Sequence, residues 1–399
     1  MELLDGVKQE MLQPEYWTDD YNLIMDAEAI RNFNRKIISD DTYRRFSLQT
    51  GELPTEEERR KFVLYNLNRQ KELPQKAEIK DQIEGGLVQF GSEYKYGICV
   101  KRDAIMSLPL SGTWPERKFF TLSPIHINEG AIIYSETKDK EWLFVRTGTY
   151  YGWVKKDSIA LCHSRDEMLE YSECNPFLVV TGESLQIPFD KADSGVIKYD
   201  MGDRIEIIDE DTDHYFINVF YAEKDGYAAK KKGIVPKKAD VHKGYLCFSK
   251  ATLISECLKC LGTGYKYGGG EGQRDCSSII MEIFSVFGIR LPRNSAWQSK
   301  IPLKSFDLSN LEIKDKCSIL DLLPTGALLF MESHDMVYLG KRESEHFIFH
   351  NVSNICQKND GIETNEYGTT ICSIERTYSL KKGCWLNLLT KAIVFGSNT

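Results

Sequence analysis

Cys276 is the residue of this sequence whose surroundings most favour nucleophilic chemistry. It follows a glycine-rich loop, Tyr265 to Asp275, and precedes the apolar segment Ile279 to Phe287, which has helical periodicity. A thiol at the first turn of a helix lies near unpaired backbone N–H groups and the positive end of the helix dipole. Both favour the thiolate, the reactive form of cysteine. The sequence therefore predicts a reactive cysteine here.

A cysteine nucleophile needs a base within hydrogen-bond reach and a third group that orients this base. Of the seven histidines, His334, His346 and His350 share the last part of the chain with Cys276. His334 begins one strand-like run and His350 ends the next. Antiparallel pairing around a turn at residues 340–346 would place these two side chains together, with His346 exposed in the turn. Cys276, His334 and His350 thus form the plan of a cysteine–histidine triad.

The composition limits the possible partners. The 399 residues are 42% hydrophobic and 28% charged, with a formal net charge of -8, which is typical of a globular protein. Sequence-independent binding of nucleic acid or of an anionic membrane requires a basic face, so we expect neither partner. No run approaches the ~20 apolar residues of a membrane span. The sequence gives no indication of the oligomeric state.

The N-terminus and the cysteines indicate the compartment. The first ten residues include acidic side chains and no apolar segment, which predicts a cytoplasmic protein without a signal peptide. A signal that had been removed would instead mean a periplasmic or extracellular protein. Eleven cysteines without framework spacing indicate free thiols. Those in apolar runs are expected to be small core residues: Cys99, Cys162, Cys247, Cys372 and Cys384.

A C-x-x-C pair, Cys257 and Cys260, lies in a segment with helical periodicity. No second Cys/His pair stands at zinc-ligand spacing. We therefore predict thiols in the core or at the surface here, and no metal or other cofactor.

The first 85 residues are charged and helical in character. Thr55 stands where an N-cap is expected and Glu58 at the matching position of a capping box, ahead of an amphipathic segment. No chemistry is visible in this region, so residues 1–85 are interpreted as a helical region that stabilises the rest of the chain.

Two stretches of short β-branched and aromatic runs follow, and they resemble each other at an offset of about 73 residues. Trp142-Leu-Phe-Val corresponds to Tyr215-Phe-Ile-Asn-Val, and Gly152-Trp-Val to Gly226-Tyr-Ala. Such spacing predicts two small antiparallel barrels, at residues 86–165 and 166–245, with a generic β-sandwich as the alternative. The pattern resembles bacterial SH3 domains.

The last part, residues 246–399, combines helical and strand-like segments. A helix from Lys250 to Leu261 precedes the Cys276 helix, which Gly288 is expected to close. Strand-like runs occupy most of the remainder. A nucleophile on a helix that packs against an antiparallel sheet is an α+β plan.

Five short motifs in this part resemble the NlpC/P60 family of papain-like cysteine peptidases. They are Asp275-Cys276-Ser277, Leu291-Pro-Arg, Pro324-Thr-Gly-Ala-Leu, His334-x-x-Val-Tyr-Leu-Gly and Phe349-His350-Asn351. The usual signature of the family reads Tyr-x-Trp-Gly-Gly, Asp-Cys-Ser-Gly, Pro-Arg, Pro-Gly-Asp-Leu and His-Val-Gly-x-Tyr-x-Gly. The resemblance implies an α+β fold, in which a papain-like catalytic domain follows two SH3-like β-barrels and a helical N-terminal region.

The resemblance also implies roles for individual residues. Cys276 matches the nucleophile, His334 the general base and His350 the residue that orients the base. Asp275, Ser277 and Ser295 match residues that contact the substrate. Tyr150, with Tyr151 as the alternative, matches a tyrosine of the SH3 domain that lines the substrate cleft.

The sequence departs from the signature: Tyr267 replaces tryptophan, Ser278 replaces glycine and Ala327 replaces aspartate. None removes a member of the triad, so we expect an active enzyme. The domain arrangement resembles that of γ-D-glutamyl-L-diamino acid endopeptidases, which implies hydrolysis of murein peptides with a free N-terminal L-Ala. The alternatives are a hydrolase of intact peptidoglycan, an acyl- or amide-transfer enzyme, and a non-catalytic wall-binding protein.

Overall fold

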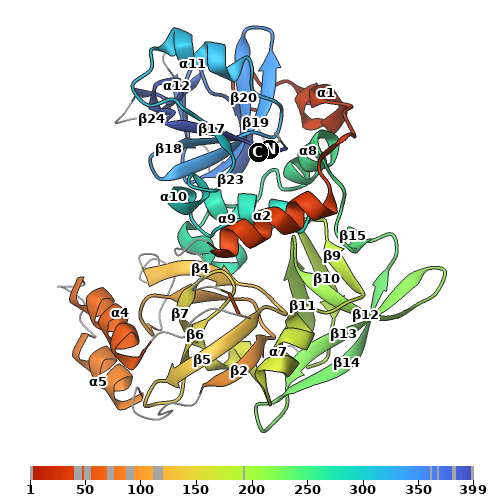
Figure 1. The fold of residues 1–399 in the computed structure, drawn as a ribbon, viewed down its shortest axis with the longest axis vertical. Coiled ribbons are helices and arrows are strands. Elements are labelled where there is room, and N and C mark those ends of the chain that lie inside the picture. The colour runs from red at the N-terminus through yellow and green to blue at the C-terminus, as the bar shows by residue number, and fades with distance from the viewer. Residues whose placement is uncertain are drawn as a thin grey trace. The chain divides into compact units, whose positions relative to one another are not determined.

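The computed structural model describes residues 3–39, 47–48, 55–69, 76–86, 94–110, 120–191, 194–359, 362–365, 368–379 and 383–396. The chain forms two compact units. We call them the helix–sheet unit, made of Met1–Ile37, Tyr245–Lys266 and Gln273–Thr399, and the barrel unit, made of Ile38–Gly244 and Tyr267–Gly272. Figure 1 shows the elements of both.

The helix–sheet unit is built on a six-stranded antiparallel sheet. Its order is β17 (Lys304–Asp307), β26 (Lys391–Val394), β18 (Leu328–Met331), β19 (His334–Arg342), β20 (Glu345–Val352) and β23 (Gly368–Ser373). Strands β19 and β20 pair from Val337↔Phe349 to Arg342↔Glu345, with a bulge between Tyr338 and Gly340. The turn is therefore shorter than the predicted 340–346.

Helices cover this sheet. They are α8 (Lys250–Lys259), α9 (Cys276–Ser285), α10 (Ser295–Gln298), α11 (Ile313–Leu320) and α12 (Trp385–Leu388). The predicted Cys276 helix is confirmed as α9, and Gly288 follows it with a positive φ of 76°. Every residue of α9 from Cys276 to Phe284 is buried, as expected for a helix enclosed on all sides. Helix α9 packs against α8 and against β19 and β20 (Figure 1).

A second, smaller sheet completes the C-terminal part. Its order is β22 (Ile362–Asn365), β21 (Cys356–Asn359), β24 (Thr377–Ser379) and β25 (Gly383–Cys384).

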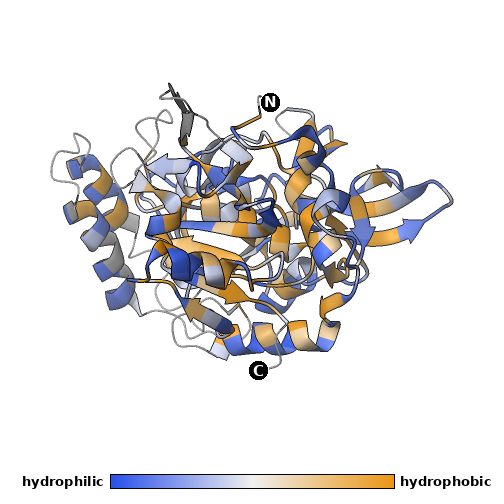
Figure 2. Ribbon diagram, turned by 90° about the horizontal axis from the view of Figure 1, so that it is seen from above, coloured by the Kyte–Doolittle hydropathy of each residue, from blue (hydrophilic) through white to orange (hydrophobic). Residues whose placement is uncertain are grey.

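The N-terminal segment belongs to the helix–sheet unit. It contains η1 (Gln9–Leu12), α1 (Pro14–Trp17), β1 (Leu23–Met25) and α2 (Ala27–Ser39), and β1 pairs with β16 (Phe248–Ser249). Helix α2 buries Ile30, Phe33 and Ile37, which share one face, and the helices in Figure 2 alternate between hydrophobic and hydrophilic residues accordingly. The Asn34 side chain donates to the carbonyl of Gly288 just after α9. The N-terminal segment thus supports the nucleophile helix.

The barrel unit contains two sheets. The first has the order β4 (Thr121–Ile125), β3 (Asp103–Met106), β7 (Tyr151–Lys155), β6 (Trp142–Arg146), β5 (Gly130–Glu136), β2 (Lys95–Cys99) and β8 (Ile159–Cys162). The second has the order β14 (Ala228–Pro236), β13 (His214–Ala222), β12 (Arg204–Glu210), β9 (Phe177–Val180) and β15 (Val241–Lys243). Helix α7 (Arg165–Ser172) connects the two stretches, and β10 (Ser184–Pro188) pairs with β11 (Val196–Asp200).

The two sheets repeat one topology. The order β7-β6-β5-β2-β8 in the first equals β14-β13-β12-β9-β15 in the second, strand for strand in chain order. Along the chain, each stretch inserts a hairpin between its first two strands of this set: β3–β4 between β2 and β5, and β10–β11 between β9 and β12. A repeated strand order is what a tandem repeat predicts. The count of two SH3-like barrels and the boundaries at residues 86, 166 and 246 stay predictions.

The other helices before residue 86 lie in the barrel unit. They are α4 (Glu56–Arg69) and α5 (Lys76–Gly86), and their residues Leu67, Ile79 and Ile83 join the core of the first barrel. The capping box that starts α4 is confirmed, since Thr55 N donates to Glu58 and Glu58 N donates to Thr55 Oγ1. The first 85 residues are therefore divided between the two units and do not form one region.

The glycine-rich loop ahead of α9 also packs in the barrel unit, as η4 (Tyr267–Gly272) against β3 and β4. Gly268 has a φ of +72°, and a Cβ there would lie 2.6 Å from the carbonyl oxygen of Thr121. This close approach of two backbones explains why the loop is rich in glycine.

The eleven cysteines, all within the described residues, are thiols, and the structure places Cys257 and Cys260 in the core, one of the two alternatives left open for them. Cys247 is exposed, so its prediction as a core residue is wrong. Among the described residues, no helix has the length and apolar character needed to cross a membrane.

Candidate active site

Cys276 is the first residue of α9, and Asp275 is its N-cap. The Asp275 carboxylate accepts a hydrogen bond from Ser278 N at 2.9 Å, and Ser278 Oγ accepts one from Asp275 N at 2.8 Å. This reciprocal capping box fixes the start of the helix. Ser278, which replaces the glycine of the family signature, is therefore accommodated by closing the box.

Asp275 is also held by a buried arginine. Arg293 Nη1 and Nη2 donate to the two carboxylate oxygens at 3.1 and 2.8 Å, and Nη1 also donates to Ser277 Oγ at 3.0 Å. Burial alone would raise the pKa of Asp275, but the charge and hydrogen bonds of Arg293 hold it below its usual range. Asp275 and Ser277 are thus buried and engaged with Arg293, and their contact with a substrate stays a prediction.

Two histidines face each other on the neighbouring strands β19 and β20. His334 Nε2 lies 3.1 Å from His350 Nδ1, and His350 Nε2 lies 3.5 Å from the sulfur of Cys372. The Trp385 ring packs edge-on against both imidazoles, with centroids 5.3 and 5.0 Å away. The side chains of His334 and His350 are buried, so this packing fixes both rings.

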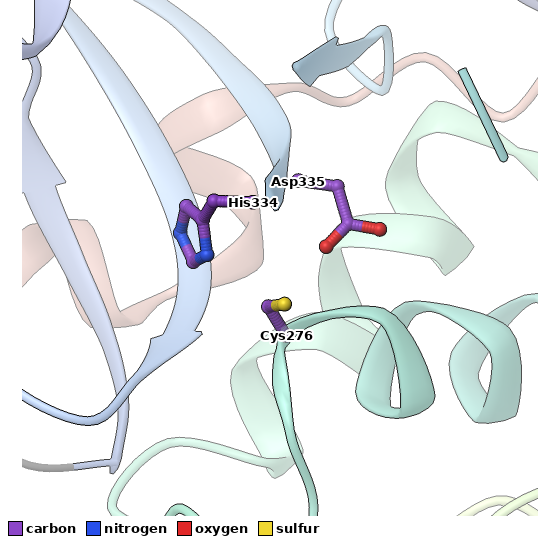
Figure 3. Close-up of side chains that lie close together, drawn as sticks. All are labelled: Cys276, His334 and Asp335. Atoms are coloured by element: carbon purple, nitrogen blue, oxygen red, sulfur yellow. The ribbon is translucent and has the colours of Figure 1, made fainter. Parts of the chain in front are cut away.

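The tight turn between β18 and β19 brings His334 to the nucleophile. Ser333, at a φ of +63°, ends this turn, and its carbonyl oxygen lies 4.0 Å from Cys276 Sγ. A ring nitrogen of His334, Cys276 Sγ and a carboxylate oxygen of Asp335 all lie within 4.8 Å of one another (Figure 3). The structure thus brings together the three residues predicted from the sequence, Cys276, His334 and His350.

The ionisation of the site differs from the expectation of a resting thiolate. Burial and the neighbouring carboxylates of Asp335 and Asp275 raise the pKa of Cys276 well above its usual range. Burial also lowers the pKa of His334 to about 4. The desolvation of both groups outweighs the position at the helix start, so the resting site holds a neutral thiol and a neutral imidazole.

Asp335 was missed by the sequence reasoning. It follows His334 directly, where the family signature has valine, and its side chain is fully buried beside Cys276. A charged residue in place of an apolar one, next to the base, was the signal that could have revealed it.

Three other residues complete the comparison with the sequence. Ser295 begins the short helix α10, which Asn294 caps, and it is half-buried. Tyr150 lies in the barrel unit, where its ring stacks on Tyr151 at 5.7 Å, so its role in a substrate cleft stays a prediction. His346 was expected in an exposed turn, but it is buried within β20.

His346 belongs to a separate cluster in the same unit. Its ring and the side chains of Cys317 and Glu375 lie within 4.8 Å of one another, a group that could hold a cation. However, Nδ1 lies 2.6 Å from Glu375 and Nε2 lies 2.9 Å from Asp321. Both ring nitrogens are thus engaged by carboxylates, which accounts for the cluster without a metal.

A cysteine at the start of a buried helix, facing a histidine on an antiparallel sheet, defines the class of papain-like cysteine peptidases. Residues 262–378 match the NlpC/P60 family, and residues 119–155 match the SH3 domain of the SH3b1 type. Residues 262–378 thus form a domain of the NlpC/P60 family of cysteine peptidases, and an SH3b1-type domain lies ahead of it in the chain.

Solved structures agree with this fold. A novel NlpC/P60 endopeptidase from Photobacterium damselae subsp. piscicida is 16% identical, with a TM-score of 0.73 over 98% of this chain and 96% of that one. An NlpC/P60 family protein from Bacillus cereus ATCC 10987 is 15% identical, with a TM-score of 0.54 over 76% of this chain and 100% of that one. No curated protein gives a significant match.

Proposed function

We propose that this chain is a cysteine endopeptidase that hydrolyses the γ-D-glutamyl-L-diamino acid bond of murein peptides with a free N-terminal L-Ala. The convergence of Cys276 with the His334–His350 pair carries the proposal. The SH3b1-type domain supports a substrate derived from the cell wall. A role in peptide recycling in the cytoplasm belongs to the same proposal.

In the proposed reaction, His334 takes the proton of Cys276 as the sulfur attacks the γ-D-glutamyl carbonyl carbon. The proton transfer accompanies the attack, because both groups are neutral in the resting structure. The backbone N–H of Cys276, in the first turn of α9, is available to stabilise the oxyanion. The imidazolium then protonates the leaving amine as the C–N bond breaks, and water hydrolyses the remaining thioester.

The substrate contacts of this proposal involve residues around the helix start. Asp275, Ser277, Ser295 and Tyr150 are proposed to bind the N-terminal part of the peptide. The negative charge that Arg293 maintains on Asp275 suits the ammonium group of a free L-Ala.

Hydrolysis of intact peptidoglycan is the second candidate function, which the SH3b1-type domain favours if it binds the wall itself. A purely structural wall-binding protein would have no use for the Cys276–His334–His350 arrangement. We therefore rank an enzyme above it.

The test compares three substrates: L-Ala-γ-D-Glu-diaminopimelate, its N-acetylated form and intact murein sacculi, with products identified by mass spectrometry. Cleavage of the free-amine peptide alone is expected, whereas release of fragments from sacculi would favour the second function. Cys276→Ala should lose turnover with nearly unchanged thermal melting. Cys317→Ala, the control, removes a half-buried thiol of the same domain and should retain turnover. Turnover by Cys276→Ala would exclude this nucleophile.

A further inference from the structure

Asp335 is a carboxylate placed beside the nucleophile without an ionic partner of its own. Its side chain is fully buried, and neither oxygen accepts a hydrogen bond of normal geometry from a described residue. One oxygen lies within 4.8 Å of both Cys276 Sγ and a His334 ring nitrogen. Figure 3 shows the sulfur between the imidazole and the carboxylate, directed to the side of Asp335.

Arg293, from the segment before α10, is the one positive charge among the groups that face Asp335 from that side. The others are Cys276, the first residue of α9, and Asp275, the N-cap of this helix. Arg293 is already engaged in two hydrogen bonds with Asp275 and one with Ser277. Arg293 therefore offsets only part of the desolvation cost of a charge on Asp335, and the pKa of this carboxyl stays raised.

The two imidazoles on the sheet side offer no compensation. Burial lowers the pKa of His334, and burial together with the adjacent His334 ring lowers that of His350, so both are neutral in the resting site. Two acids, the Cys276 thiol and the Asp335 carboxyl, therefore share one buried site. The arginine that faces this site, Arg293, is already paired with Asp275. Such groups cannot both be ionised without a large electrostatic cost.

We propose that Asp335 works as an uncharged carboxylic acid during catalysis, and that its ionisation keeps Cys276 in the unreactive thiol form. Asp335 acts through Cys276 and does not touch the substrate. In the active state the Asp335 O–H faces the sulfur as a hydrogen-bond donor while the thiol proton moves to His334. The S–H bond breaks and an N–H bond forms, and no other reactant is required.

The acid–base properties of the site agree with this arrangement. Burial raises the pKa of Asp335 to about 7, with the Cys276 thiol opposing the shift as a donor. Loss of the Asp335 proton then places a negative charge beside the sulfur, which raises the pKa of the thiol further. Activity should therefore decline on the alkaline side of neutrality, where an ordinary cysteine nucleophile becomes more reactive.

The test measures the reactivity of the thiol directly, so it depends on Cys276 being accessible but not on the proposed peptide. The rate of alkylation of Cys276 by iodoacetamide is followed against pH, with the modified peptide quantified by mass spectrometry. In Asp335→Asn, which keeps the shape and removes the charge, the midpoint of the alkylation rate against pH should fall by about 1 unit. This corresponds to a rate gain of about tenfold at pH values well below both midpoints. The alkaline decline of turnover should disappear in the same variant.

Two further variants make the result decisive. Asp335→Val also removes the carboxyl, but it replaces it with an apolar side chain. It should lower the alkylation midpoint by the same amount even if Asp335→Asn folds poorly. Asp307→Asn changes an exposed carboxylate on β17 and should leave the midpoint unchanged. An unchanged midpoint in both Asp335 variants would overturn the inference. A shifted midpoint without peptide cleavage would sustain it and count instead against the proposed substrate.

Discussion

His334 and His350 are joined ring to ring, with Nε2 of the first 3.1 Å from Nδ1 of the second. If His334 accepts the thiol proton on Nδ1, its Nε2 must carry a hydrogen and donate to His350 Nδ1. His350 then carries its own hydrogen on Nε2, towards the sulfur of Cys372 at 3.5 Å. The pair thus selects one tautomer of the base, which is the role that the third residue of a triad requires.

Removing the His350 ring, which accepts the hydrogen bond from His334, should slow the chemical step. His350→Ala leaves the His334 N–H unpaired in a buried site, so we expect kcat to fall by about 10²- to 10⁴-fold with a smaller change in KM. His350→Asn can supply an amide oxygen as acceptor and should retain more of the rate. Cys372→Ala serves as the control and should stay near wild type, because a thiol is a weak acceptor. Steady-state kinetics that give equal kcat for His350→Ala and wild type would contradict the orienting role.

The pair of Arg293 and Asp275 gives the second prediction. Arg293→Met leaves Asp275 buried without its charge partner, and loss of one member of a buried pair costs about 3–5 kcal/mol. Arg293→Lys keeps the charge but not the two parallel hydrogen bonds, so its loss should be intermediate. Urea unfolding measures both, with the exposed Arg290→Met as the control. Equal stabilities of Arg293→Met and Arg290→Met would show that the pair is dispensable for folding.

The third prediction concerns the SH3b1-type domain. A Cβ on Gly152 would lie 2.5 Å from the carbonyl oxygen of Met106 on the neighbouring strand, whereas a Cβ on Gly148 would meet nothing within 4 Å. Gly152→Ala should therefore force the strands apart and cost about 1–3 kcal/mol. Gly148→Ala, four residues earlier, should stay within about 0.5 kcal/mol of wild type. Thermal or urea unfolding of the two variants tests the difference, and equal midpoints would refute the close packing of β3 against β7.

The proximity of Cys276, His334 and His350 could be predicted because it depends on local patterns. Helical periodicity after Cys276 indicates the helix, and antiparallel pairing of the two adjacent runs brings the start of the first, His334, close to the end of the second, His350. The position of His346 could not be predicted in this way. Gly340 was read as the start of the turn, but with a φ of +126° it lies within β19, at a bulge that lets the strand continue to Arg342.

The state of the thiol depends on contacts between distant residues. The helix start at Cys276 and the neighbouring Asp275 are visible in the sequence, but the carboxylate of Asp335 comes from a segment about 60 residues further along the chain. Asp335 was overlooked because neighbouring residues of a strand point to opposite faces. At the end of β19, next to the turn, both His334 and Asp335 are directed towards Cys276 (Figure 3).

The last prediction concerns the stability of the catalytic domain against pH. Burial would lower the pKa of His346, but the hydrogen bonds of Glu375 and Asp321 raise it above the usual value of 6.5. A folded-state pKa above the unfolded value stabilises the protein fully below the unfolded pKa, and this contribution is lost as the pH rises through the folded pKa. His346→Gln should therefore destabilise the domain most in mildly acidic solution, with a smaller difference from wild type in alkaline solution. Lys341→Met removes only the neighbouring surface pair with Asp321, and its effect should vary little over the same range. Melting temperatures of the three proteins across this pH range measure the effect. A difference between wild type and His346→Gln that grows with pH would have the opposite sign, and it would refute stabilisation by a protonated His346 held between Glu375 and Asp321.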